Sequence, residues 1–231
     1  MSRPELGRAL AERWPGRDPI ALARSAQGLL PIVHPPPDGT WGRRGTTPFT
    51  LADRWLDRPP ADEPSARELV LRYLTAFGPA SVKDIQAWSG MTRLREVVES
   101  LRPRLRVFRN EMGGELFDLP DAPRPDPDVP APVRFLAALD NAVLAHADRT
   151  RMMTDEQRKH TIVEAAMTVD GFVCGLWAIK RDRKDTATLV VKLFEPLAGQ
   201  DVAAVTEEGV RLLRFAAADA DGHDIRFHSV D

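Results

Sequence analysis

Residues 65–120 decide the fold of this chain, and they read SARELVLRYLTAFGPA (65–80), SVKDIQAWSG (81–90), MTRLREVVESLRP (91–103) and RLRVFRNEMGGELFDLP (104–120). The first segment predicts a helix. A capping box at Ser65 and Glu68 precedes an apolar face at helical spacing, and Gly78 and Pro79 end the pattern. The residues of that face are Leu69, Val70, Tyr73, Leu74 and Phe77.

The next segments predict two further helices and a hairpin. Ser81 and Asp84 form a second capping box, and Gly90 ends the helix whose buried stripe is Val82, Ile85 and Trp88. We expect Thr92 to cap the third helix and Pro103 to stop it. Apolar runs on either side of the turn at 110–114 predict two paired strands. Three helices followed by a hairpin is the order of a winged helix-turn-helix domain, which we place at residues 63–120.

The third helix of such a domain is the one that reads DNA. Residues 91–110 hold six arginines and two glutamates, a local net charge of +4 that suits a phosphate backbone. Glu96 and Glu99 lie at the centre of the polar face, where they would repel phosphates. Two hypotheses stay open: this surface contacts DNA, or the domain is a packing module. For the first, the candidate residues are Thr92, Arg93, Arg95, Arg102, Arg104, Arg106 and Arg109.

Residues 1–57 predict a partial winged-helix domain. Two helices, starting near Pro4 and Pro19, precede strands at 32–34 and 49–51. The Pro- and Gly-rich stretch between those strands is the expected wing. Its candidate DNA contacts are Trp41, Arg43 and Arg44, although the tryptophan packing back on its own domain is an equal alternative. One helix fewer than a winged helix needs is present, so we expect the chain to begin inside a domain.

Residues 133–231 predict a C-terminal domain. Proline-rich segments at 57–64 and 120–132 predict linkers. After the second, three β-rich runs between 161 and 197, a helix over 200–218 and a strand at 225–230 predict an α+β domain with a mostly antiparallel sheet. The densest polar cluster in this domain is HADRTR at 146–151. Three hypotheses concern it. The first is a polar loop that satisfies its own backbone, the second is a nucleic-acid contact through His146, Arg149 and Arg151, and the third is a contact of His146 and Arg149 with a partner domain.

Composition limits the chemistry. The chain has 231 residues, a formal net charge of −2 and one cysteine, Cys174, in an apolar run. No intrachain disulfide is possible, so we expect a reducing cytoplasm and treat Cys174 as a core residue. The five histidines lack ligand spacing, and the chain has no CxxC, HExxH, GxxxxGK or GxGxxG motif. The sequence therefore predicts no metal, no cofactor and no membrane partner.

Several runs together resemble one family. They are LLPIVHPPPDGTWGRRG, ELVLRYLTAFGPASVKDIQAWSGM, LREVVESLRPRL, LFDLPDAPRPDPDVPAPVRFL and LDNAVLAHADRTR. They resemble the bacterial winged-helix DNA-binding proteins that include the interstrand cross-link DNA glycosylases (AlkZ-like). The resemblance covers essentially the whole chain. It implies tandem winged helix-turn-helix domains followed by the C-terminal β-rich domain, double-stranded DNA as the partner, and a role in DNA repair.

The same resemblance bears on catalysis. The glycosylases of this family carry a Gln-x-Gln or Gln-x-Asp motif near the N-terminus, and none of Gln27, Gln86, Gln157 and Gln200 is paired in that way. We therefore expect the catalytic motif to be missing together with about one winged helix, and no catalytic residue can be assigned. Three functions remain open: a duplex-binding repair protein, a base-excision glycosylase or a fragment of one, and a non-catalytic protein-interaction module.

Overall fold

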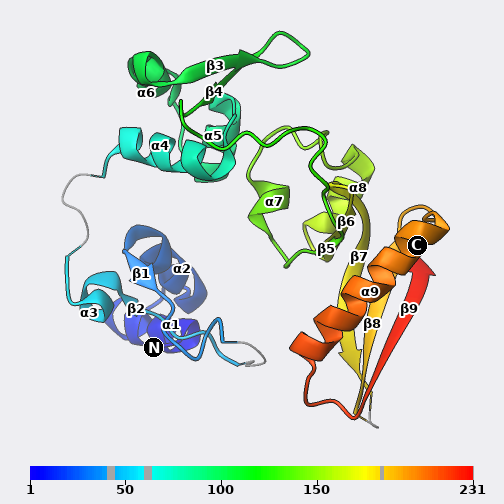
Figure 1. The fold of residues 1–231 in the computed structure, drawn as a ribbon. Coiled ribbons are helices and arrows are strands. Elements are labelled where there is room, and N and C mark those ends of the chain that lie inside the picture. Colours follow the sequence, from blue (N-terminus) through cyan, green and yellow to red (C-terminus); the bar gives the residue numbers. More distant parts are fainter. Residues whose placement is uncertain (41–44, 60–63, 183–184, 231) are drawn as a thin grey trace. The chain divides into compact units, whose positions relative to one another are not determined.

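The chain divides into two compact units, residues 1–65 and 66–231. The computed structural model describes residues 1–40, 45–59, 64–182 and 185–230 (Figure 1). Among these residues, none of the helices has the length and apolar character needed to cross a membrane. The architecture is mixed α+β, as the sequence predicted. The wing residues Trp41, Arg43 and Arg44 lie outside the described residues.

The first unit contains two helices and a short strand pair. Helix α1 (Arg3–Arg13) starts at a capping box between Ser2 and Glu5, and α2 (Pro19–Leu29) is capped by the Asp18 carboxylate. Strands β1 (Ile32–Val33) and β2 (Thr50–Leu51) pair antiparallel, which confirms the predicted partners. Helix α3 (Ala52–Leu56) follows β2 directly.

The second unit begins with three helices and a hairpin, in the predicted order. These are α4 (Ala66–Phe77), α5 (Val82–Ser89), α6 (Arg95–Leu101) with the 3₁₀ turn η1 (Arg102–Arg104), and the strands β3 (Arg106–Arg109) and β4 (Glu115–Asp118). We call residues 66–119 the helix–hairpin module. Its core is one apolar cluster to which every helix contributes, and the members with no more than 1% exposure include Val70, Leu74, Ile85, Val98 and Leu101. Hydrophobic burial of this kind is what holds short helices together.

Local details of the module both confirm and correct the sequence analysis. The Ser81–Asp84 capping box and the left-handed Gly90 cap of α5 are confirmed. The Thr92 cap is wrong: Arg93 adopts a φ of 61°, so the chain turns once more and Leu94 becomes the residue before α6. Trp88 is not buried but 38% exposed, because its ring covers Tyr73 and Phe77 at the edge of the core.

The linker 120–132 contains no helix or strand, and it is anchored at its beginning. Arg124 on the linker pairs with Asp118 at 2.8 Å, and the Asp118 side chain is fully buried. The same guanidinium donates to the Leu119 carbonyl oxygen and lies over the Phe108 ring. The ion pair thus ties the linker to the hairpin from which it leaves.

A five-stranded sheet with one long helix dominates the rest of the unit. Its order is β5 (Arg134–Phe135), β6 (Ala165–Val169), β7 (Phe172–Arg181), β8 (Thr186–Leu193) and β9 (Gly222–Ser229). Helix α9 (Gly199–Ala216) covers one face (Figure 1). It packs closely because a Cβ on Gly209 would lie 2.7 Å from Leu189 Cδ2. The short helices α7 (Asn141–Leu144) and α8 (Asp155–Thr161) precede β6.

The sheet corrects one expectation. Three strand pairs are antiparallel, as predicted, but β9 runs parallel to β8 along its whole length. The reason is the connection: α9 carries the chain back to the start of β8, so the next strand runs in the same direction. The antiparallel prediction is therefore wrong for the last pair, and the sheet is mixed.

Candidate nucleic-acid interface

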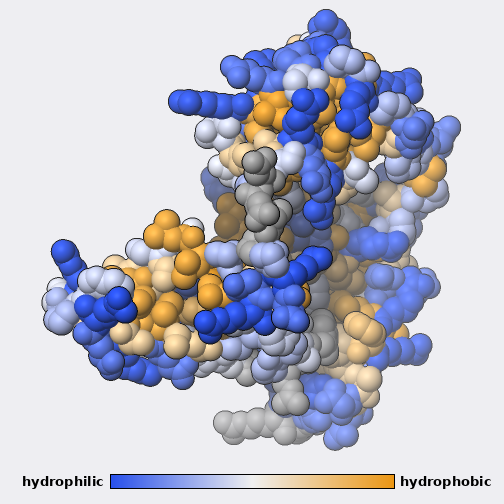
Figure 2. Space-filling view, turned by 90° about the vertical axis from the view of Figure 1, so that its left-hand side faces the viewer, coloured by the Kyte–Doolittle hydropathy of each residue, from blue (hydrophilic) through white to orange (hydrophobic). Residues whose placement is uncertain are grey.

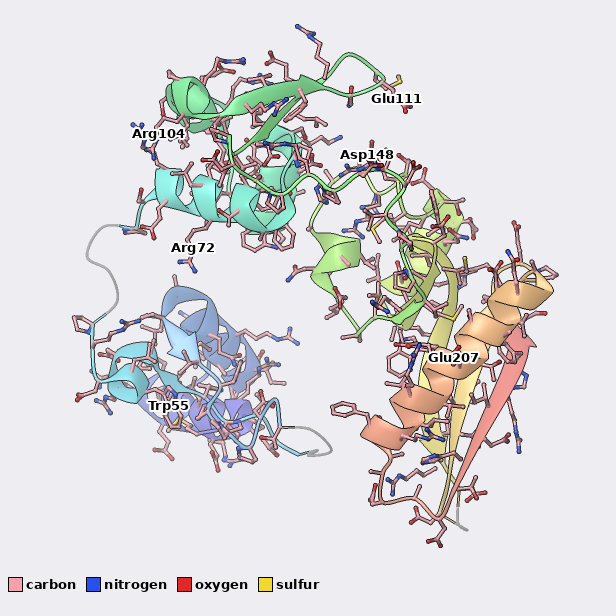
Figure 3. The ribbon with its side chains drawn as sticks, in the orientation of Figure 1. Trp55, Arg72, Arg104, Glu111, Asp148 and Glu207 are labelled. Carbon is pink, nitrogen blue, oxygen red and sulfur yellow. The ribbon has the colours of Figure 1, made fainter. Side chains whose placement is uncertain are left out.

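The arginines predicted to contact DNA lie at the surface of the helix–hairpin module. Thr92, Arg93 and Arg95 are exposed before and at the start of α6, and Arg104, Arg106 and Arg109 are exposed along η1 and β3. Figure 3 shows Arg104 beside α6 and Glu111 at the hairpin turn, on the side of the module away from Arg72 of α4. One continuous segment therefore carries six of the predicted residues to the solvent.

Arg102 differs from these neighbours. Its guanidinium pairs with Glu99 at 2.7 Å and with Glu115 at 2.8 Å, and it lies over the Phe117 ring. These bonds raise the pKa of Arg102, and hydrogen bonds from Arg102 lower the pKa values of Glu99 and Glu115. The prediction that Arg102 contacts DNA is not tested by this geometry, but its charge already has two local carboxylates.

Two hairpin arginines are positioned by contacts that involve no carboxylate. The Arg106 guanidinium lies 4.9 Å from the centre of the Phe108 ring, and Arg109 Nη1 donates to the Gly113 carbonyl oxygen at 3.1 Å. Stacking and a carbonyl bond orient a guanidinium but leave its charge in place. These two side chains are therefore better placed than Arg102 to meet an external phosphate.

The HADRTR segment, by contrast, packs against the helix–hairpin module. Tyr73 donates its hydroxyl to the Ala145 carbonyl oxygen at 2.7 Å, and His146 Nε2 donates to the Phe77 carbonyl oxygen at 3.1 Å. The Ala147 backbone N–H donates to Asp84 Oδ1 at 2.9 Å. We call these three contacts the α4–α5 seam. The sequence analysis offered a partner-domain contact for His146 but could not name the partners, because they are more than sixty positions apart.

Burial and hydrogen bonding shift the pKa values of the side chains in the seam. Burial raises the pKa of Tyr73, with the Asp84 charge adding to the effect. Burial acts to raise the pKa of Asp84 too, but hydrogen bonds from Ser81 and Ala147 outweigh it, so the pKa lies below its usual range. Burial and the charge of Arg151 lower the pKa of His146. Asp84 is thus held as an anion with both oxygens occupied, which is a structural role rather than a catalytic one.

Arg149 and Arg151 follow the seam. Arg151 is exposed, whereas Arg149 is partly buried, and its Nε donates to the His146 carbonyl oxygen at 3.3 Å. Burial lowers the pKa of Arg149, with the charge of Arg158 acting in the same direction. Figure 3 places the adjacent Asp148 in the loop between α7 and α8. The structure thus brings His146, Arg149 and Arg151 together in one loop.

The face of the sheet away from α9 carries a basic hollow that the sequence analysis missed. A cavity of about 420 Å³ is lined by His160, Lys180, Lys192 and His228, with Glu164 paired to Lys192 at 2.6 Å. The alternation of polar and apolar residues along β8 and β9 could have revealed it. Lys192 pairs with His228 on one face of the sheet, and the neighbouring apolar pair, Val191 and Phe227, lies on the other face. On the face drawn in Figure 2, hydrophilic residues surround the hydrophobic residues that reach the surface.

Two further sequence expectations concern chemistry. Cys174 is partly buried and packs against the apolar cluster under α9, and burial raises the pKa of its thiol, so the expectation of a core residue is met only in part. Among the residues that the structure describes, no group of three or more His, Cys, Asp or Glu side chains is arranged to hold a metal ion.

Comparison with known proteins identifies the family. The family model described as "DNA glycosylase AlkZ-like" matches residues 1–215. This chain belongs to the AlkZ-like DNA glycosylase family. Among solved structures, the AlkZ-like chain is similar to the Streptomyces sahachiroi DNA glycosylase AlkZ, with a TM-score of 0.68 and 22% identity over 98% of this chain. The AlkZ-like chain spans 64% of the length of that structure. No curated protein matches it.

Proposed function

We propose that this chain binds duplex DNA in a function related to DNA repair, and that the helix–hairpin module is a winged helix that binds the duplex. The observation that carries the proposal is the family match over residues 1–215, because the matched family is described as DNA glycosylase AlkZ-like. That membership supports DNA as the partner, and we propose that the DNA is double-stranded.

The winged-helix part of the proposal is supported by a third strand-like segment in the module. Ala80, between α4 and α5, exchanges two backbone hydrogen bonds with Phe117 of β4, at 2.9 and 2.8 Å. The hairpin is thereby attached to the turn between the first two helices, so β3 and the turn at 110–114 project from a fixed base. In this arrangement α6 is the recognition helix and the hairpin is the wing. The first unit, with its β1–β2 pair, is proposed as a second and partial winged helix.

The alternative of a protein-interaction module rested on the acidic centre of α6. Arg102 pairs with Glu99 and with Glu115 from within the module, so its one positive charge offsets part of the acidic charge at this surface, while Glu96 has no such partner among the ion pairs of the described residues. The arginines of η1 and β3 then give the surface a positive charge even though the whole chain has a net charge of −2. This balance favours nucleic acid over protein as the partner.

Duplex binding is tested by fluorescence anisotropy with labelled DNA at increasing salt. With about four phosphates neutralised, the slope of log K against log salt is expected near −3.6. Several unrelated duplexes should bind alike, since phosphate contacts carry no sequence information. A flat salt dependence, or no binding at low salt, would contradict the proposal.

Base excision itself is the second candidate function, and the family match favours it. A glycosylase needs a positioned carboxylate or amide that activates water at an extruded nucleotide. Asp84 is buried but fully engaged, and no Gln-x-Gln pair is present in the sequence. Incubation with an alkylated or cross-linked duplex decides the matter. Release of the modified base above a no-protein control would show excision by this chain, whereas we expect binding without release.

A further inference from the structure

The loop between α7 and α8 encloses a small pocket. Its volume is about 250 Å³, many times the roughly 10–15 Å³ that one water molecule needs. Val143 and Met152 form apolar walls, and His146, Arg149 and Arg151 supply the nitrogen atoms. We call it the Arg149 pocket. It lies beside the α4–α5 seam, so the same contacts that hold His146 also hold one side of the pocket.

The partly buried guanidinium of Arg149 is incompletely bonded. Nη1 is inaccessible to solvent and has no hydrogen-bond partner among the described residues, while Nε makes the bond to His146 described above. Arginine keeps its charge and five N–H donors, and a buried donor without an acceptor costs free energy. Such groups are rare in folded proteins, and a ligand that accepts hydrogen bonds is one explanation for them.

The carboxylates near the pocket have other partners. Asp148 lines the pocket, but its Oδ1 accepts hydrogen bonds from the Thr150 backbone N–H at 3.0 Å and from the Thr150 hydroxyl at 2.7 Å. Asp84 is occupied by Ser81 and Ala147. The pocket lining therefore holds two guanidinium groups against one carboxylate, an excess of positive charge.

We propose that the Arg149 pocket binds a phosphate group, and that in the complex with DNA this group is a phosphate of the duplex backbone. Guanidinium groups fit phosphate oxygens through paired N–H donors, which a single ammonium does not reproduce. Arg149 and Arg151 both line the pocket, and the exposed Arg151 supplies its charge from the solvent side. The DNA part of this inference rests on the proposed function, whereas the phosphate part rests on the pocket alone.

The first arm of the test uses inorganic phosphate with the whole chain, measured by isothermal titration calorimetry at constant ionic strength. Arg149→Met keeps most of the side-chain volume without the donors, and it is expected to weaken phosphate binding at least tenfold. The phosphate affinity of Arg149→Lys should lie between those of Arg149→Met and the wild type. Arg211→Ala on α9 is the matched control, since Arg211 pairs with Glu207 and Glu208 far along the chain, and it should bind phosphate like the wild type. If Arg149→Met unfolds, the exposed Arg151→Gln replaces it.

The second arm measures duplex binding of the same variants against salt. Arg149→Met should reduce the magnitude of the log–log slope by about 0.9, the value for one lost phosphate contact. Arg211→Ala should leave the slope unchanged. Circular dichroism of each variant confirms that it is folded.

The outcomes distinguish the phosphate-binding pocket from the proposed binding of duplex DNA. Unchanged phosphate affinity in Arg149→Met overturns the pocket inference, whatever happens to duplex binding. Arg149-dependent phosphate binding with an unchanged duplex slope overturns the DNA backbone as the source and leaves a site for free phosphate. Arg149-dependent phosphate binding by a chain that binds no duplex refutes the proposed function but not the pocket.

Discussion

Two arginine-rich regions of the unit 66–231 hold their charge in opposite ways. In the helix–hairpin module, the arginines from 93 to 109 are exposed, apart from Arg102, which has Glu99 and Glu115 as partners. In the loop after α7, Arg149 is partly buried with one nitrogen unpartnered. Exposed charges are screened by water and cost little, whereas a buried charge needs a partner. The exposed arginines of the first region suit contacts with several phosphates along a DNA backbone, whereas Arg149 suits a contact with one phosphate group.

The largest effect should come from Asp84, which connects the two regions. Replacing it with Ala leaves the N–H groups of Ser81 and Ala147 without their acceptor inside a partly buried seam. The free energy of unfolding should fall by about 3 kcal/mol, given about 1–3 kcal/mol for each buried donor left unpaired. Urea denaturation followed by circular dichroism measures it.

Ser81→Ala is the control for this change, because it removes the α5 cap and leaves the Ala147 contact in place. It should cost only about 1 kcal/mol. Equal losses in the two variants would show that the bond between Asp84 and Ala147 adds no stability, and the seam would then depend on the bonds of Tyr73 and His146.

The next effect separates exposed from paired arginines in the module. Replacing Arg95, Arg104 and Arg106 together with Ala should reduce the magnitude of the duplex salt slope by about 2.7, at about 0.9 for each lost contact. Arg102→Ala should change it far less, because Glu99 and Glu115 already neutralise that charge. Anisotropy at four or more salt concentrations gives the slopes. Equal slopes for the triple variant and the wild type would remove the module from the DNA interface.

A smaller effect concerns pH and His146. Its pKa is lowered in the folded chain from an ordinary value near 6.5, so below pH 6.5 the unfolded chain binds a proton that the folded chain does not. The stability that His146 contributes is full above pH 6.5 and is lost as the pH falls toward the folded pKa, by at most about 1.4 kcal/mol per pH unit. The charged groups that act on His146 are Arg151, Asp84 and Asp148.

Urea midpoints at pH 7.5 and pH 5.5 measure this effect. The loss on acidification should be smaller in His146→Gln than in the wild type, since glutamine does not titrate. An equal loss in both chains would assign the acid sensitivity to other groups.

The two regions also show what a sequence reveals. The helices and hairpin of the module follow from local signals, namely the Ser81–Asp84 box, the glycine at position 90 and the spacing of apolar residues. The role of Asp84 did not follow: it reads as the third residue of a capping box, and its bond to Ala147 spans 63 positions. The parallel pairing of β9 was missed for the same reason, because it depends on where α9 delivers the chain. The site residues from 92 to 109 and at His146, Arg149 and Arg151 stay predictions.

The smallest effect tests whether α6 itself approaches the duplex. Glu96 is exposed in the first turn of α6, and Glu99 is engaged by Arg102. If α6 lies against phosphates, Glu96→Gln removes a repulsion and should strengthen duplex binding roughly two- to threefold at low salt, as befits a screened surface charge. Glu99→Gln should act similarly, and it should also remove one ion-pair partner of Arg102, which leaves that guanidinium more available to a phosphate. Both effects should disappear at high salt. Unchanged affinity in both variants, together with a large loss when only Arg104 and Arg106 are replaced with Ala, would assign the binding to η1 and β3 and would place α6 away from the DNA.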